Sequence, residues 1–139
     1  MARDKHFTMR MAASVYERLQ QRADEGRESK ASLAERYIDE GLRQDSHPEI
    51  VFHPGPLGRR AMLAGTRLEV RHVIETLRNS DNSLEETARY LALPVGKVQA
   101  CLSYYAAYQD EVDGQAQRVR EANERAEAAW RREQELLAV

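Results

Sequence analysis

Two different hydrophobic periods mark the first part of the chain. Between residues 6 and 11 an apolar side chain stands at every second position, the alternation expected of a β-strand. One face of this strand is apolar, with Phe7, Met9 and Met11, and the other is polar, with His6, Thr8 and Arg10. From residue 14 the apolar positions recur every three or four residues, which predicts two helices separated by Gly26. Ser14 is expected to cap the first helix, and Ser29 or Ser32 the second.

After a linker at residues 44–48, the pattern predicts a strand pair followed by helices. The strands are expected at 50–53 and 61–63, joined by a turn rich in proline and glycine. Helices are expected at 70–78, 83–92 and 94–108. Gly114 is expected to separate them from a last, highly charged helix at 115–138.

The predicted fold class is therefore mainly α with short strands. We expect three parts: a domain at 1–44, a second domain at 50–113 and a C-terminal helix at 114–139.

The first domain cannot complete its own hydrogen bonding, because its single strand has no partner within the domain. A second copy of the chain supplies the missing strand if the two strands pair antiparallel. The four helices of the two copies then close the core beneath this strand pair. The polar faces of both strands then point outward as a two-stranded ribbon, which fits the major groove of B-DNA. An ordinary surface strand on a small α+β domain is the alternative.

This segment resembles the ribbon-helix-helix family of repressors and antitoxins over about residues 4–44. The resemblance implies a homodimer that binds operator DNA. Its base-contacting positions fall on His6, Thr8 and Arg10, next to Lys5, and its phosphate clamp falls near Ser29, Lys30 and Ser32. Ala12 stands where the family commonly has proline.

Residues 50–113 resemble a small family of antitoxin domains found with VapB-type partners of PIN-fold ribonucleases. The resemblance rests mainly on Gly65-Thr66-Arg67 followed by an apolar run, and it implies a strand pair packed on helices that include a helix-turn-helix-like pair. The helix at 94–108 offers only Lys97 as a basic residue and is followed by acidic residues, so we expect it to pack rather than read DNA. Arg67 either pairs with a partner protein or, as we favour, makes a contact inside the domain.

The C-terminal helix is either a solvated surface helix or a segment that binds a groove of a partner. In the second interpretation Trp130 is the anchor, with Leu136 and Leu137 beside it. Arg131 or Arg132 then pairs with the clustered carboxylates by which PIN-type ribonucleases hold metal. The spacing does not select the arginine, and Arg118, Arg120 and Arg125 are the alternatives. The VapB-type resemblance implies this kind of blocking.

The charge is distributed unevenly along the chain, and the composition narrows the possible functions. The net charge of -2 hides a basic start, since residues 1–30 carry seven Lys or Arg against five Asp or Glu, whereas residues 79–113 carry two against six. One cysteine suits a reducing cytoplasm, and no apolar run is long enough for a membrane span. The four histidines lack metal-ligand spacing, and neither a nucleophile elbow nor a phosphate loop is present, so we expect no enzyme and no cofactor.

These patterns together predict the antitoxin of a toxin–antitoxin pair, which binds its operator as a dimer and neutralises a PIN-fold ribonuclease. A stand-alone ribbon-helix-helix repressor with an accessory interaction domain is the alternative. A third possibility is an adaptor that multimerises without binding DNA.

Overall fold

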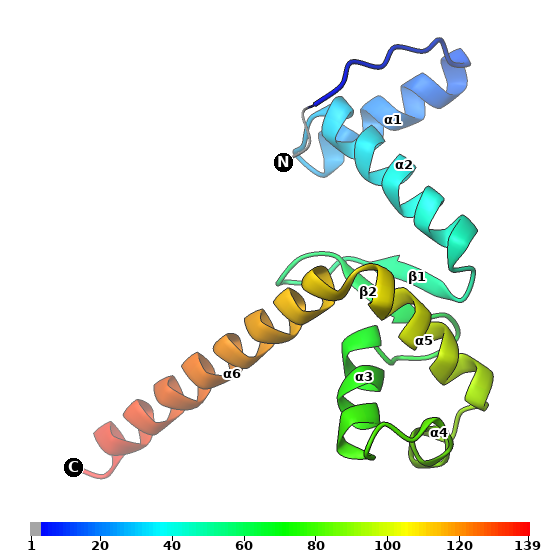
Figure 1. Ribbon diagram of the computed structural model, residues 1–139. Helices are drawn as coiled ribbons and strands as arrows, with labels where there is room; N and C mark the ends of the chain where they lie inside the picture. Colours follow the sequence, from blue (N-terminus) through cyan, green and yellow to red (C-terminus); the bar gives the residue numbers. More distant parts are fainter. Residues whose placement is uncertain (1–3) are drawn as a thin grey trace. The chain divides into compact units, whose positions relative to one another are not determined.

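The computed structural model describes residues 4–139, and this part of the chain is mainly helical (Figure 1). It contains six helices and one two-stranded antiparallel sheet. The elements are α1 (Ala13–Glu25), α2 (Lys30–Ser46), β1 (Ile50–His53), β2 (Arg60–Leu63), α3 (Val70–Asn79), α4 (Leu84–Leu91), α5 (Val95–Ala107) and α6 (Gln109–Leu137). Among the described residues, none of the helices combines the length and the apolar character that a membrane span requires.

The chain divides into two compact units, unit 1 (Met1–Leu42) and unit 2 (Arg43–Val139). The described part of unit 1 consists of an N-terminal segment, α1 and most of α2. Ala23 of α1 and Leu33 of α2 are its buried apolar residues. The predicted strand at residues 6–11 is not assigned as a strand in this single chain. Because a strand is defined by hydrogen bonds to a neighbouring strand, its pairing with a second copy stays a prediction.

The start of α1 differs from the expected one. The helix begins at Ala13, and the Ala12 carbonyl accepts the N–H groups of Val15 and Tyr16 at 3.0 Å each. Ser14 thus lies inside the helix, and the predicted capping box at Ser14 is wrong. Alanine has the highest helix propensity, which accounts for the extension of the helix ahead of the serine.

The start of α2 is capped by Ser29, one of the two serines expected to do so. Its Oγ accepts the Ser32 N–H at 3.0 Å, and its carbonyl accepts the Leu33 N–H at 3.0 Å. The helix then continues to Ser46, through most of the segment predicted as a linker. Its last residues belong to unit 2, where the Gln44 amide donates to the Ile50 carbonyl at 3.4 Å.

Unit 2 begins with the predicted strand pair. β1 and β2 are antiparallel, from the pair Ile50–Leu63 at one end to His53–Arg60 at the other. Gly65 makes the turn after β2 with a φ of +76°, which glycine adopts without steric cost. The Thr66 hydroxyl holds this turn, since it donates to the Leu63 carbonyl at 2.8 Å and accepts the Leu68 N–H at 3.0 Å.

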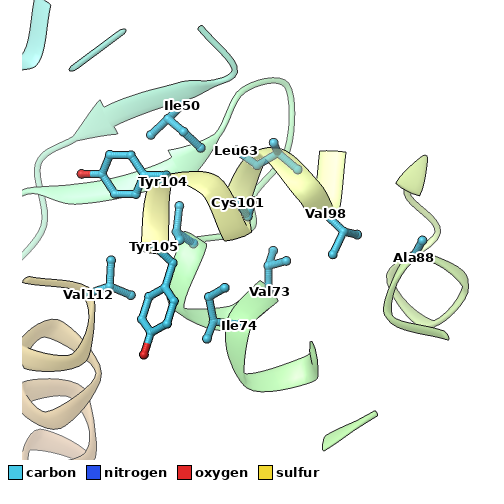
Figure 2. Close-up of a cluster of buried hydrophobic side chains, with 11 residues drawn as sticks. Ile50, Leu63, Val73, Ile74, Ala88, Val98, Cys101, Tyr104, Tyr105 and Val112 are labelled. Carbon is cyan, nitrogen blue, oxygen red and sulfur yellow. The ribbon is translucent and has the colours of Figure 1, made fainter. Parts of the chain in front are cut away.

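The core of unit 2 lies between the sheet and the helices that follow it (Figure 2). Helix α5 crosses this core and contributes Val98, Cys101 and Tyr104, all with no exposed surface. Helices α3 and α4 pack against α5 and against each other. Ser83 caps α4, with its hydroxyl accepting the Glu86 N–H at 3.1 Å.

Helix α6 begins at Gln109 and continues through Gly114, so the predicted break at this glycine is wrong. Val112 and Gln115 lie on either side of the glycine and are buried in unit 2. A glycine inside a helix costs about 1 kcal/mol relative to alanine, and the burial of the apolar Val112 side chain offsets that cost. Figure 1 shows the later part of α6 extending away from the other elements of unit 2.

Candidate nucleic-acid and partner interfaces

An open apolar groove of about 530 Å³ lies between the N-terminal segment, α1 and α2. We call it the N-terminal groove. Its lining residues are Met9, Met11, Val15, Arg18, Leu19, Arg22, Ala34, Tyr37 and Ile38. Met9, Val15, Tyr37 and Ile38 are each about half exposed, as is unusual for large apolar side chains that lie next to one another. The groove thus joins half-exposed apolar side chains from three parts of unit 1, the N-terminal segment, α1 and α2.

The polar residues of the same N-terminal segment do not line the groove. Lys5, His6, Thr8 and Arg10 are exposed and are absent from its lining, whereas Met9 and Met11 are part of it. Within residues 4–139 these four polar side chains make no hydrogen bond or ion pair with the rest of the chain. Around Met9 and Met11 the segment therefore has the two-sided character that its alternating sequence predicts, whereas Phe7, the third residue of the predicted apolar face, is 73% exposed and does not line the groove.

The predicted phosphate clamp lies at the first turn of α2. The N–H groups of Lys30 and Ala31 come before the first helical hydrogen bond, at the positive end of the helix dipole. The Lys30 ammonium turns back onto α1, where it lies 4.3 Å from the centre of the Tyr16 ring and donates to Gln20 Oε1 at 3.0 Å. Ser29 and Ser32 are exposed, with the Ser29 hydroxyl used as the helix cap.

The predicted partner-binding residues all lie on the exposed end of α6. Every residue from Asn123 onward is exposed, including Trp130, Leu136 and Leu137. Arg131 pairs with Glu127 one turn earlier at 2.5 Å. Arg132 is exposed and makes no ion pair among the described residues.

Two further residues singled out in the sequence lie in unit 2. Lys97, the basic residue at the start of α5, pairs with Glu49 at 2.6 Å. Arg67 is exposed and makes no hydrogen bond or ion pair within residues 4–139, in contrast to the expected contact inside the domain. The charge of Lys97 is thus balanced by Glu49, and Arg67 lies between β2 and α3, so neither residue gives α5 a basic surface.

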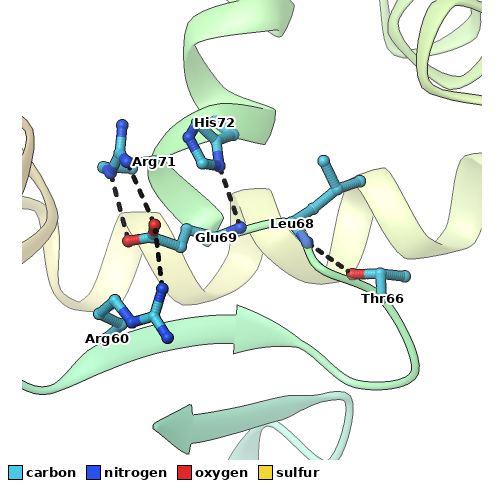
Figure 3. Close-up of polar contacts among 6 residues, drawn as sticks. All are labelled: Arg60, Thr66, Leu68, Glu69, Arg71 and His72. Atoms are coloured by element: carbon cyan, nitrogen blue, oxygen red, sulfur yellow. Dashed lines mark hydrogen bonds and ion pairs between the residues drawn. The ribbon is translucent and has the colours of Figure 1, made fainter. Parts of the chain in front are cut away.

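A buried carboxylate that the sequence did not reveal lies at the start of α3 (Figure 3). Glu69 is 7% exposed, and Arg71 donates to its two carboxylate oxygens at 3.2 and 3.1 Å. Arg60 Nη1 lies 3.7 Å from Glu69 Oε2 and forms a second ion pair with it. The Arg60 side chain passes so close to Gly55 that a Cβ there would lie 2.9 Å from it, which explains the glycine. These contacts join the turn between β1 and β2, strand β2 and the start of α3.

His72 completes the cap of α3. The Glu69 N–H donates to His72 Nδ1 at 3.2 Å, so this nitrogen must be unprotonated. Burial, and then the positive charge of Arg71, lowers the pKa of His72 below its ordinary value. The cap and the pKa shift both favour the neutral imidazole.

A small recess opens beside this carboxylate, between β2, the start of α3 and the start of α6. Its volume is about 30 Å³, and we call it the arginine recess. It is lined by Arg59, Ala61, Glu69, Val70, Arg71, Glu111, Val112, Gln115 and Arg118. Its charged residues come from three separate stretches of sequence, so the spacing along the chain gave no signal of it.

An arginine–tyrosine cluster fixes the end of α2 to the rest of unit 2. Arg43 Nη1 donates to the Tyr104 hydroxyl at 2.9 Å and to Glu111 at 2.6 Å, and the Tyr104 hydroxyl donates to Glu111 at 3.1 Å. Burial raises the pKa of Tyr104 above its ordinary value. The same physical cause raises the pKa of Cys101 to about 12, so this thiol stays protonated and unreactive at neutral pH.

No described group of three or more His, Cys, Asp or Glu side chains has the arrangement of a metal site. In the comparison with protein families, a family described as "Protein of unknown function (DUF433)" matches residues 50–105, from β1 to α5. Neither the curated proteins nor the solved structures gave a match to the chain.

Proposed function

We propose that this chain is the antitoxin of a type II toxin–antitoxin pair, which binds its own operator as a dimer and neutralises a PIN-fold ribonuclease. The N-terminal groove carries the first half of this proposal. A second copy of the chain covers it when the two N-terminal segments pair as antiparallel strands.

The chemistry of unit 1 supports this choice of occupant. A two-fold contact needs a self-complementary surface, and five of the seven exposed residues of the groove are apolar, the other two being Arg18 and Arg22. Pairing also satisfies the backbone N–H and C=O groups of residues 6–11, which have no ladder partner in the single chain. Thr8 and Arg10 of both copies then lie on the outer face of the ribbon, where an arginine fork can bind guanine.

The exposed end of α6 supports the second half. The 15 exposed helical residues from Asn123 to Leu137 gain little stability from their own sequence, since helical stability in proteins comes mostly from packing. Its half-exposed Trp130 and its two terminal leucines give it an apolar side suited to a partner's groove. Arg132 is better placed than Arg131 to reach a carboxylate of the partner, because Arg131 is already paired with Glu127.

DNA binding is tested with Arg10→Ala in the full chain and duplex DNA from upstream of its own gene. We expect the substitution to abolish specific binding and to leave the dimer mass unchanged. Arg67→Ala is the matched control, because this exposed arginine of unit 2 also makes no ion pair among the described residues. Retained specific binding by the Arg10 variant refutes the ribbon assignment.

Neutralisation is tested by removing residues 123–139, all of which are exposed, and co-expressing the shortened chain with the neighbouring gene. We expect DNA binding to persist and the inhibition of the toxin to be lost. A shortened chain that still restores growth overturns the role of α6.

A stand-alone repressor is the alternative, and the arginine recess is the observation in its favour. A recess lined by charged side chains in unit 2 is a feature that a ligand-responsive repressor can use. A neighbouring gene product that neither slows growth nor binds the chain favours this alternative.

A further inference from the structure

The side of α6 that packs on unit 2 continues beyond the point where the packing ends. Near the start of the helix this side is covered, since Val112 is buried and Val119 is partly buried. At 3.6 residues per turn, the same side then carries three exposed apolar residues, Ala126, Trp130 and Leu137. We call these three the α6 stripe. They lie on the part of α6 that extends away from the other elements of unit 2, so the chain itself leaves the stripe uncovered (Figure 1).

A row of arginines runs beside the α6 stripe. Arg118, Arg125 and Arg132 are seven residues apart, and seven residues make almost two full turns, so they lie one above the other with a drift of about 20° per step. All three are exposed, and none makes an ion pair within residues 4–139. Arg118 donates to the amide oxygen of Gln115 at 2.6 Å. The row thus presents positive charge that no carboxylate of the described chain neutralises.

The glutamates of the same part of α6 are kept apart from this face. Helical spacing puts four of the five outside the arc between the row and the stripe, and Glu133 inside it. The four are Glu121, Glu124, Glu127 and Glu135. One side of α6 therefore combines an apolar stripe with a basic edge.

The distribution of charge limits which partner this face fits. Residues 118–137 carry five arginines and five glutamates, so the segment has no net charge with which to attract a polyanion such as DNA. A second copy of α6 is no better match. In an antiparallel pair the two arginine rows would face each other, and in a parallel pair each row would face the Trp130 edge of the other copy. Charge complementarity calls instead for a protein surface with carboxylates.

The spacing of the row selects the shape of that surface. Successive arginines are about 10.5 Å apart along the axis of α6. Carboxylates seven residues apart on a partner helix repeat at the same distance of about 10.5 Å, whereas side chains on one face of a β-strand repeat at about 6.6 Å. Arginine forks bind carboxylates through paired hydrogen bonds. The row thus matches a helix with acidic residues along one edge.

We propose that α6 docks beside a helix of its toxin that carries Asp or Glu at every seventh residue. Arg118, Arg125 and Arg132 pair with these carboxylates, and Trp130 covers the apolar side of the same helix. Arg131 faces away from the toxin and keeps its ion pair with Glu127. This inference rests on the proposed function, and it adds which side of α6 makes the contact and which kind of element receives it.

The test compares two double variants of the full chain for binding to the product of the neighbouring gene, measured by titration calorimetry. Arg125→Gln with Arg132→Gln removes two members of the row. Arg120→Gln with Arg131→Gln is the matched control, because it removes two arginines of the same segment that face away from both the row and the stripe. Glutamine is a good helix former, so both variants keep α6.

The row variant should bind the toxin about 100-fold more weakly, since each lost charge-assisted contact costs about tenfold in affinity. Its affinity should also depend less on salt concentration, because two ion pairs are missing. The control should bind as the unchanged chain does, and all three chains should bind operator DNA equally.

Equal binding of the toxin by both variants overturns the inference and leaves the proposed function standing. If the unchanged chain does not bind the product of the neighbouring gene, the proposed function fails and the inference fails with it. Sedimentation velocity of the chain alone adds a third outcome. An assembly larger than a dimer that is lost in the row variant and kept in the control assigns the face to a second copy, and so overturns the inference.

Discussion

Shortening Ile38 in the N-terminal groove should weaken the proposed dimer by a calculable amount. Ile38 is 49% exposed in the single chain, and a second copy would cover it. Full burial of an isoleucine contributes about 1.5–3 kcal/mol, so Ile38→Ala should lose about 1 kcal/mol in each copy. A two-fold interface counts the change twice, and about 2 kcal/mol corresponds to a roughly 30-fold higher Kd of the dimer.

Sedimentation velocity over a range of concentrations measures this Kd. Tyr90→Ala is the control, because Tyr90 is 80% exposed on α4 in unit 2 and does not line the groove. The control should dimerise as the unchanged chain does. If both variants weaken the dimer equally, or if Ile38→Ala has no effect, the two copies do not meet through this groove.

Two further predictions concern unit 2. Tyr104→Phe should lower the free energy of unfolding, measured in urea, by about 1–2 kcal/mol. The substitution removes the hydroxyl that contacts Arg43 and Glu111, but these two side chains still pair directly with each other, so a loss above about 4 kcal/mol would contradict the prediction. Because the pKa of His72 is lowered in the folded state, the unfolded chain binds the proton more readily, so the stability from this group is complete above about pH 7.5 and falls as the pH drops through 6.5. His72→Asn keeps an acceptor for the Glu69 N–H and should flatten Tm between pH 7.5 and 5 relative to the unchanged chain, whereas an equal slope in both would refute the assignment.

The periodicity of apolar residues predicted most of the elements because the helices and strands of this chain are amphipathic. The strand at Ile50–His53 lies where the sequence places it, and α3 begins at the predicted Val70. The ends were less predictable, since they depend on local competition. Ser14 does not cap α1, because the preceding alanines favour the helix and extend it to Ala13. Gly114 does not end α6, since Val112 and Gln115 on either side of it are buried in unit 2.

The sites differ in how far the sequence could predict them. Alternation within residues 6–11 was enough to predict an apolar and a polar face, because both faces lie on one short segment. The arginine recess depends on Arg59, Arg71 and Arg118, which the turn after β1, the capped start of α3 and the uninterrupted α6 bring together. No local pattern encodes that arrangement.

The mass of the full chain in dilute solution tests the central claim most directly. If two copies pair through their N-terminal segments, light scattering at micromolar concentration should give twice the 15.9 kDa of one chain. A mass of one chain under these conditions would contradict the claim, because a lone copy has no second strand with which to form the ribbon.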